Sequence, residues 1–220
     1  MTVHSLCAVS PTTYHYLLGE EAASTEKEAW DHRYNKNNFY IFGKMPSSFL
    51  SDHLHYLPKE GSVLDIAMGE GRNAVFLAKL GYKVTGIDIS SVAIKKAHQL
   101  AGEQETKIKT INASMNDHHF APKSFDVILC FYYINRKTIR SYENLLKDDG
   151  VLMVESFSEQ QKKVDGFPFE LYSEEDFLQQ GELLSFFRNL DVLKFEKSEV
   201  EGNYREFIIA RKKRKGSNLL

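Results

Sequence analysis

The chain has 220 residues, which is long enough for one well-buried α/β domain and short for two. Apolar residues make up 42% of it and charged residues 26%, a composition that excludes a disordered or collagen-like chain. The formal net charge of -2 gives no global basic field for a nucleic-acid backbone and no acidic field for a basic partner, which favours chemistry on small molecules.

The first residues carry no sign of export or membrane insertion. Met1 to Pro11 lacks a basic start and a sustained apolar core, and the two cysteines are Cys7 and Cys130, so we expect a reduced, cytoplasmic setting. No apolar run approaches the roughly 18 residues of a membrane span, and no Cys/His cluster has zinc spacing. We therefore expect neither a membrane span nor a metal.

The N-terminal part of the chain divides into two regions. Residues 1–25 have no clear period and are predicted to form a weakly ordered extension. Residues 26–58 are rich in aromatic side chains and end in an amphipathic pattern that predicts a helix over 49–57, stopped by Pro58.

From Ser62 onward, short apolar runs alternate with helical patterns. Strands are predicted at 62–67, 83–88, 107–112, 125–131 and 150–157, and helices at 72–81, 90–101, 137–147 and 174–187. Ser90 and Gly81 supply capping signals for two of these helices. Strands separated by helices form a parallel sheet that is covered on both faces.

The C-terminal part departs from this alternation. Two strands, 190–200 and 203–212, are joined by a tight turn at Gly202 and must form an antiparallel hairpin. The basic run RKKRK (211–215) follows, but no aromatic residue interleaves with it as in single-strand nucleic-acid binders, so residues 213–220 are predicted to be a disordered tail. We expect a single domain over 26–212.

The turn after the first strand, in VLDIAMGEGRNA (63–74), is the predicted ligand site. In open α/β sheets, ligands bind beyond the carboxyl ends of the strands, where the strand order reverses. Gly69 and Gly71 let a ligand approach the backbone, and the amides that open the next helix favour an anion. The alternative is a turn that only connects the strand to the helix.

Two cofactor classes compete for this turn. Gly69, Gly71 and Ala74 satisfy the dinucleotide pattern G-x-G-x-x-A, and Asp88 closes the next strand, where NAD enzymes bind the ribose hydroxyls. Asp65 and Glu70 would repel a pyrophosphate, however, and suit a ligand with an ammonium group. The sheet also ends in a hairpin, without the second substrate-binding region that a dehydrogenase needs.

The combination of DIAMGEG (65–71), Asp88 in VTGIDIS and LLKDDGVLMVES (145–156) resembles the class I S-adenosylmethionine-dependent methyltransferases. Together with GFPFELYSEEDF (166–177), it looks most like the tellurite-resistance methyltransferases and their thiol-methylating relatives. The resemblance implies a Rossmann-like, doubly wound seven-stranded sheet, mostly parallel, with strand order 3-2-1-4-5-7-6.

Two positions depart from the pattern of these methyltransferases. Ala67 stands where they prefer glycine, and we expect it to require a backbone φ below zero. Ser114 stands where an acid often faces the adenine amino group, although a hydroxyl can also accept that hydrogen bond.

The resemblance also implies roles for single residues. Asp65 would orient the amino group of the methionine moiety and Asp88 the ribose hydroxyls. The other implied cofactor-binding residues are Arg33, Tyr34, Ala67, Gly69, Gly71, Arg72, Asn73, Ile89, Ser114, Met115, Cys130 and Phe131. Each role has a structural alternative: Asp88 could cap the following helix, and Cys130 could be a small buried apolar side chain.

Residues on the acceptor side are suggested less directly. Tyr132, Tyr133 and Asn135 follow the fourth strand and either line an acceptor pocket or pack against the core. His118 and His119 lie in a polar loop and could supply a general base or be exposed to solvent.

Segments 30–34 and 39–43 either form a lid, with Arg33 and Tyr34 as polar contacts, or a packed N-terminal helix held by Trp30 and Phe39. Gly166 to Phe169, with Glu170, could form the far wall of the acceptor site.

We therefore predict methyl transfer from S-adenosylmethionine to a small-molecule acceptor such as a thiol, a metalloid oxyanion or a similar heteroatom nucleophile. The expected protein is a monomer or homodimer without membrane or nucleic-acid partners. Two alternatives stay open: an NAD(P)-dependent oxidoreductase, and a non-catalytic module that binds S-adenosylmethionine.

Overall fold

The computed structural model describes residues 25–36, 39–165, 167, 174–200 and 202–214. Three predicted features lie wholly or mostly outside the described residues: the N-terminal extension with Cys7, the GFPF turn with Glu170, and the end of the basic tail. Where the tail begins, Lys213 and Arg214 form ion pairs with Asp191 and Asp149, at nitrogen–oxygen distances of 3.0 and 2.6 Å.

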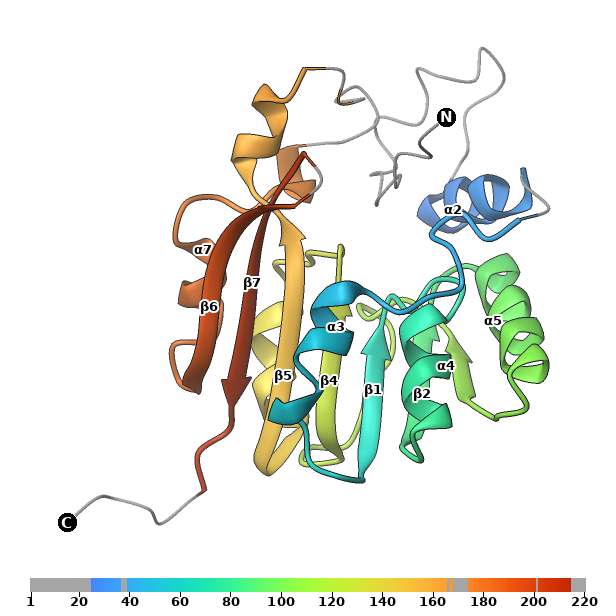
Figure 1. Cartoon of the computed structure of the whole chain (residues 1–220), viewed down its shortest axis with the longest axis horizontal. Helices are drawn as coiled ribbons and strands as arrows, with labels where there is room; N and C mark the ends of the chain where they lie inside the picture. The colour runs from blue at the N-terminus through green and yellow to red at the C-terminus, as the bar shows by residue number, and fades with distance from the viewer. Residues whose placement is uncertain (1–24, 37–38, 166, 168–173, 201, 215–220) are drawn as a thin grey trace.

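Seven strands form one sheet with the order β3-β2-β1-β4-β5-β7-β6 (Figure 1). Their bounds are β1 Ser62–Ile66, β2 Lys83–Asp88, β3 Lys109–Asn112, β4 Phe125–Phe131, β5 Leu146–Phe157, β6 Asp191–Val200 and β7 Asn203–Arg211. Strands β1 to β5 run parallel to one another, whereas β7 is antiparallel to both β5 and β6. The predicted Rossmann-like sheet, its strand order and its antiparallel hairpin are confirmed.

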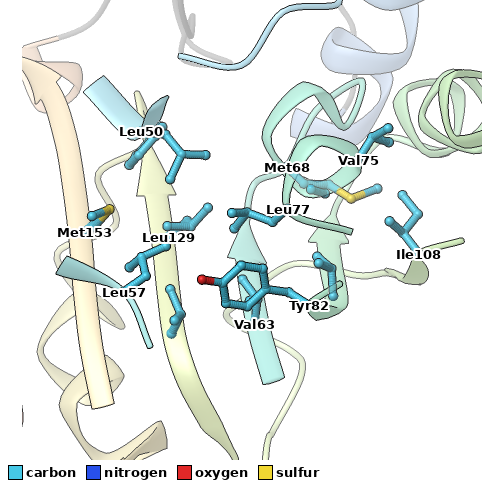
Figure 2. Close-up of a cluster of buried hydrophobic side chains, with 14 of the residues drawn as sticks. Leu50, Leu57, Val63, Met68, Val75, Leu77, Tyr82, Ile108, Leu129 and Met153 are labelled. Atoms are coloured by element: carbon cyan, nitrogen blue, oxygen red, sulfur yellow. The ribbon is translucent and has the colours of Figure 1, made fainter. Parts of the chain in front are cut away.

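Helices cover both faces of this sheet. Helices α3 (Ser48–Asp52), α4 (Arg72–Lys79) and α5 (Ser91–Glu103) pack on one face, and α6 (Tyr142–Leu145) and α7 (Glu182–Phe186) pack on the other. Apolar side chains alternate between the two layers along each strand because neighbouring residues point to opposite faces. Figure 2 shows the first layer, where Leu77 and Tyr82 lie over Val63 and Leu129.

The two residues predicted to cap helices, Ser90 and Gly81, lie at the helix ends as expected. The Ser90 hydroxyl accepts a hydrogen bond from the Ala93 amide at 3.1 Å and so caps the start of α5. Gly81 follows the end of α4 with a φ of 96°, a left-handed conformation that glycine adopts without a steric penalty. A further helix, α2 (Glu26–Asn35), lies beyond the carboxyl ends of the parallel strands (Figure 1).

The helix predicted over 137–147 is wrong in its length. A 3₁₀ turn, η2 (Ile139–Ser141), leads into the single turn of α6, and β5 already begins at Leu146 instead of Gly150. Leu146 pairs with Phe125 of β4, and the strand passes through an irregularity before Val151 pairs with Val127. Pairing between strands distant in sequence has overridden the local helical pattern.

Two other predicted helices are interrupted. The 174–187 segment contains a 3₁₀ turn, η5 (Glu174–Asp176), and then α7, because Leu178 pairs with Ser158 and Gly181 adopts a φ of 76°. The 49–57 segment divides at His53 into α3 and a 3₁₀ turn, η1 (Leu54–Tyr56).

Candidate functional site

A pocket of about 950 Å³, open to solvent, lies at the carboxyl ends of β1, β2 and β4. Its walls come from the turn after β1, the ends of β2 and β4, the segment after β3, and helix α2. This is the edge at which ligands bind in open α/β sheets, because the strand order reverses between β1 and β4.

Most residues predicted to contact a cofactor line this pocket: Tyr34, Asp65, Ala67, Gly69, Arg72, Asn73, Asp88, Ile89, Ser114, Met115 and Phe131. Tyr132 and Tyr133 line it as well. Six predicted residues are not among the described residues of its wall: Arg33, Gly71, Cys130, Asn135, His118 and His119. Sequence reasoning missed Glu26, Ile87 and Ala113, which do line it, whereas Phe42 belongs to the 39–43 segment that is predicted as a possible lid.

The glycine turn depends on two left-handed residues. Gly69 has a φ of 55°, and a Cβ there would lie 2.9 Å from the Tyr34 hydroxyl oxygen. Gly71 has a φ of 81°, and a Cβ there would lie 2.7 Å from the Cβ of Ala97 in α5. Gly69 therefore leaves room for a side chain of α2, and Gly71 allows α5 to pack closely against the turn.

Ala67 is also left-handed, with a φ of 52°. The expectation of a φ below zero is wrong: the bend between β1 and the glycine turn imposes this conformation, and the alanine methyl group is accommodated within it. A left-handed residue other than glycine costs about 1–2 kcal/mol. The departure from glycine at this position therefore carries a strain energy that the rest of the fold outweighs.

Replacing Ala67 with glycine is expected to raise the free energy of unfolding by about 1 kcal/mol, because it removes the left-handed strain at the cost of some added freedom in the unfolded chain. Urea denaturation of the two proteins would measure the difference. An ordinary Ala→Gly replacement lowers stability by about 0.5–1 kcal/mol, so a loss of that size would show that Ala67 is not strained.

Asp65 is a buried carboxylate at the pocket wall, with 2% of its surface exposed. The Ala74 amide donates to the carboxylate, whereas Oδ2 has no hydrogen-bond partner among the described residues. Burial raises the pKa of Asp65 to about 7, with a further contribution from the charge of Asp88, while the Arg72 guanidinium opposes the shift. A cationic group in the pocket would offset the free-energy cost of burying the Asp65 charge, and it would supply the hydrogen-bond donor that Oδ2 lacks.

Asp88 lies at the end of β2 with both carboxylate oxygens engaged. Oδ2 accepts from the Gly69 amide and Oδ1 from the Ser90 amide, each at 2.8 Å. Burial raises its pKa to about 6, although these two hydrogen bonds lower it. Because Ser90 itself caps α5, Asp88 instead joins the glycine turn to the start of that helix and still has lone pairs for a ligand.

Glu70, predicted to repel a pyrophosphate and to suit an ammonium group, has both carboxylate oxygens engaged within the protein. Its Oε1 pairs with the Lys96 ammonium at 2.9 Å, and its Oε2 accepts from the Ile41 amide at 2.7 Å. The carboxylate is thus neutralised and ties the 39–43 segment to the turn. The electrostatic case against a pyrophosphate therefore rests mainly on Asp65.

Helix α2 closes over the turn through several contacts. Asp31 accepts from the Ser90 hydroxyl at 2.7 Å and from the Val92 amide at 3.2 Å, which docks α2 on the start of α5. Tyr34 is buried and stacks on Trp30 with ring centroids 5.6 Å apart. Arg33 lies over the Trp30 ring, with its Cζ atom 5.2 Å from the centroid.

Arg72 and Asn73, at the start of α4, hold the segment that follows α2. Arg72 donates to the Phe42 carbonyl at 3.1 Å, and the Asn73 side-chain oxygen accepts from the Ser47 amide at 2.8 Å. Both predicted cofactor residues therefore line the pocket wall and also bind the pocket cover, which consists of α2 and the segment that follows it. No sequence pattern indicates these contacts, because they join segments far apart in the chain.

The end of β4 forms the remaining wall. Cys130 is fully buried, its thiol donates to the Tyr133 carbonyl at 3.1 Å, and burial raises its pKa. These features fit the alternative of a small buried side chain.

Burial also raises the pKa of Tyr133 to about 12, although the Asn135 amide donates to its hydroxyl at 3.0 Å. His118 packs on Phe120, with ring centroids 4.5 Å apart.

The described part of the chain carries no feature of a membrane span or a metal centre. None of its helices is long and apolar enough to cross a membrane. Within the same residues, no group of three or more His, Cys, Asp or Glu side chains could hold a metal ion.

Comparisons with known proteins agree with this geometry. Residues 63–150 match a family model described as a methyltransferase domain. An uncharacterized methyltransferase of Schizosaccharomyces pombe, C750.03c, is 31% identical over 108 residues, which cover 46% of this chain and 74% of that protein. YqeM of Bacillus subtilis, also named as a methyltransferase, is 30% identical over 129 residues, which cover 54% of this chain and 51% of YqeM.

The chain thus spans about half the length of YqeM, one of the curated relatives that it matches. Among solved structures, TehB from Haemophilus influenzae superposes with a TM-score of 0.63 and 18% identity, covering 84% of this chain and 67% of that one. At this identity the likeness extends to the fold alone.

Proposed function

The chain belongs to the class I S-adenosylmethionine-dependent methyltransferases, and from this premise we propose that its pocket binds S-adenosylmethionine and that the protein methylates a small-molecule acceptor. The observation that carries the proposal is Asp65. Its buried carboxylate has an oxygen without a partner among the described residues, next to a turn that leaves the backbone accessible. The ammonium group of a methionine moiety supplies the charge and the donors that this oxygen lacks.

The remaining roles follow from position along the pocket. We assign Asp88 to the ribose hydroxyls, because its carboxylate lies at the wall and keeps free lone pairs. Ile89, Ser114 and Met115 would contact the adenine, and the Gly69 backbone the methionine moiety. Arg33, Gly71 and Cys130 would act indirectly, because they lie outside the described wall.

Bound S-adenosylmethionine supplies an electrophilic methyl group on a sulfonium. The chain's own contribution is to position the acceptor and exclude water. Phe131, Tyr132 and Tyr133 line the end of β4, and Trp30 and Tyr34 form the cover, so the wall near the acceptor is mostly aromatic. Such a wall suits an uncharged or polarisable group better than a strongly hydrated one.

The acceptor that we propose is a small heteroatom nucleophile, with thiols and metalloid oxyanions as the leading classes. The described lining residues include one cation, Arg72, against the carboxylates of Glu26, Asp65 and Asp88, while the lining carboxylate of Glu70 is neutralised by Lys96. This balance disfavours a multiply charged oxyanion and favours a thiol. It also disfavours the pyrophosphate of NAD(P), the cofactor of the competing oxidoreductase hypothesis.

Calorimetric titration of the chain with S-adenosylhomocysteine and with NADH tests the cofactor. We expect saturable binding of S-adenosylhomocysteine only, and binding of NADH alone would overturn the proposal. Incubation with S-adenosylmethionine and a panel of thiols and metalloid oxyanions, followed by mass spectrometry, tests catalysis. A methylated product is expected; its absence across the panel, with cofactor binding intact, would favour a non-catalytic binding module.

A further inference from the structure

A chain of four polar residues, two of them buried and two partly buried, begins at Tyr132 in the pocket wall. Glu155 in β5 and Arg205 in β7 form an ion pair, with Nη1 2.9 Å from Oε1, and only 3% and 11% of their side chains are exposed. The same Arg205 nitrogen donates to the Tyr132 hydroxyl. On the far side, the Ser47 hydroxyl donates to Glu155 Oε2 at 3.1 Å.

This ion pair is poorly explained by stability. Removing two charges from water costs several kcal/mol per ion, and well-packed apolar residues often stabilise such a position as well or better. The pair does, however, give Tyr132 a fixed cationic neighbour. The position of the ion pair beside Tyr132 therefore suggests that it serves the pocket and not the stability of the fold.

The backbone of Tyr132 is held in an unfavourable conformation. Its φ is 58°, a region that costs an aromatic residue free energy and that occurs at functional sites more often than elsewhere. The Tyr132 amide donates to the Glu155 carbonyl at 2.7 Å, which fixes this conformation to β5. Tyr132 lines the pocket in this conformation, and its ring packs on Phe157, with ring centroids 5.4 Å apart.

The hydrogen-bond chemistry sets the direction of the Tyr132 hydroxyl. A guanidinium carries donors and no acceptor, so the Tyr132 oxygen must accept from Arg205, and its own proton turns away from Arg205. A phenol that accepts from a cation becomes a stronger donor to its next partner. Tyr132 is therefore equipped to donate to an electron-rich atom at the acceptor end of the pocket.

We propose that Arg205, held by Glu155, is a positioning residue that makes the Tyr132 hydroxyl the hydrogen-bond donor to the methyl acceptor, and that this acceptor is a thiol bound as its thiolate. The inference rests on the proposed function and narrows its acceptor class. A polarised donor stabilises the anionic nucleophile more than its neutral form, so a larger fraction of the bound thiol is reactive at neutral pH.

The reaction balances without a further reactant. The thiol proton passes to solvent when the thiolate binds. A lone pair of the thiolate sulfur forms the new sulfur–carbon bond, and the breaking bond leaves its electron pair on the departing sulfonium sulfur. Two neutral thioethers result, and Tyr132 keeps its proton throughout.

The test compares two thiols that need this assistance to different degrees. At pH 7.5, 2-mercaptoethanol is mostly protonated, whereas the more acidic benzenethiol is mostly ionised. Tyr132→Phe and Arg205→Met are expected to lower kcat/KM by more than about tenfold for 2-mercaptoethanol and much less for benzenethiol. For 2-mercaptoethanol, the rise of kcat with pH, which reports the ionisation of the bound thiol, should also move to higher pH.

Three controls separate positioning from folding. Affinity for S-adenosylhomocysteine should stay within about threefold of the unmodified chain, and Arg205→Lys, which keeps the cation, should recover part of the activity. Arg205→Met combined with Glu155→Gln avoids a buried unpaired carboxylate if the single variant fails to fold. Arg136→Met removes another arginine ion pair, with Glu182 at 2.6 Å, that is not part of the described wall, and it should retain activity.

Equal losses for both thiols, or an unchanged pH profile, would overturn the role of Arg205 and Tyr132. A chain that binds S-adenosylhomocysteine and methylates metalloid oxyanions but neither thiol would overturn the thiol class alone. A chain that does not bind S-adenosylhomocysteine would instead overturn the proposed function.

Discussion

Replacing Asp65 with asparagine is expected to stabilise the unliganded protein while weakening its binding of S-adenosylhomocysteine. The pKa of Asp65 is raised from 3.8 to about 7, so the folded state binds a proton more readily than the unfolded state does. This carboxylate therefore makes stability fall as pH rises from about 4 to 7. Asparagine has no charge to bury, and at pH 8 it should raise the free energy of unfolding by on the order of 2–4 kcal/mol.

The same replacement removes the proposed partner of the cofactor's amino group. A hydrogen bond to a buried charge contributes about 1.5–3 kcal/mol, so affinity should fall roughly ten- to a hundredfold. In the unmodified chain, affinity should rise as pH increases through the range of about 6 to 7, because Asp65 must ionise to bind the ammonium group and Asp88 accepts more strongly from the ribose hydroxyls when it is ionised. The asparagine variant should show a flatter profile in calorimetric titrations between pH 5 and 8.

Asp126→Asn is the matched control. Asp126 is not part of the described pocket wall, and its pKa is lowered because the Lys147 ammonium and the Ser62 side chain and amide stabilise the charged form. Asparagine there should reduce stability at pH 8 and leave S-adenosylhomocysteine binding unchanged. If Asp65→Asn behaves like this control, Asp65 is neither strained by burial nor in contact with the cofactor.

The predictable part of this protein is local in sequence. The parallel sheet follows from the alternation of strands and helices, and the antiparallel hairpin from its short turn, whereas the strand order is implied by the family resemblance; all three are confirmed. Asp65, Gly69 and Asp88 are recognisable because the turn after β1 and the end of β2 place chemically distinctive residues at known points of such a sheet. In these places the pattern of a few neighbouring residues determines the geometry.

The unpredicted part depends on contacts between distant segments. Arg205 reaches Tyr132, and Asp31 reaches Ser90, only after the sheet has formed. The helical pattern of 137–147 could not reveal that Leu146 pairs with Phe125. Ala67 shows the same limit for backbone conformation, since the bend imposes a φ that its residue type disfavours. In each case, contacts between segments distant in sequence determine the local geometry.

The pocket cover illustrates how such contacts combine. Glu70 and Arg72 lie close together in sequence at the glycine turn, and both hold the segment after α2: Glu70 through the Ile41 amide, Arg72 through the Phe42 carbonyl. A change in the turn would therefore be transmitted to the cover. This coupling makes the glycines of the turn sensitive positions for stability as well as for binding.

Gly71→Ala is expected to cost about 3 kcal/mol of stability, because two separate penalties apply. The left-handed φ of 81° costs about 1–2 kcal/mol in any residue with a Cβ. The new methyl group would also lie 2.7 Å from the Ala97 Cβ and 3.2 Å from its Cα, so α5 must move outward, and such overpacking costs about 1–3 kcal/mol.

Gly81→Ala and Ala97→Gly separate the two penalties in urea denaturation. Gly81 has a φ of 96°, and no atom of the described residues lies within 4 Å of where a Cβ would stand, so its alanine variant should pay the conformational penalty alone, about 1 kcal/mol. Ala97→Gly should be less harmful beside Gly71→Ala than in the unmodified chain, because it removes one of the two colliding carbons. A coupling of about 1 kcal/mol is expected from this double-mutant cycle. Strict additivity would mean that α5 does not pack against the turn as closely as Gly71 permits.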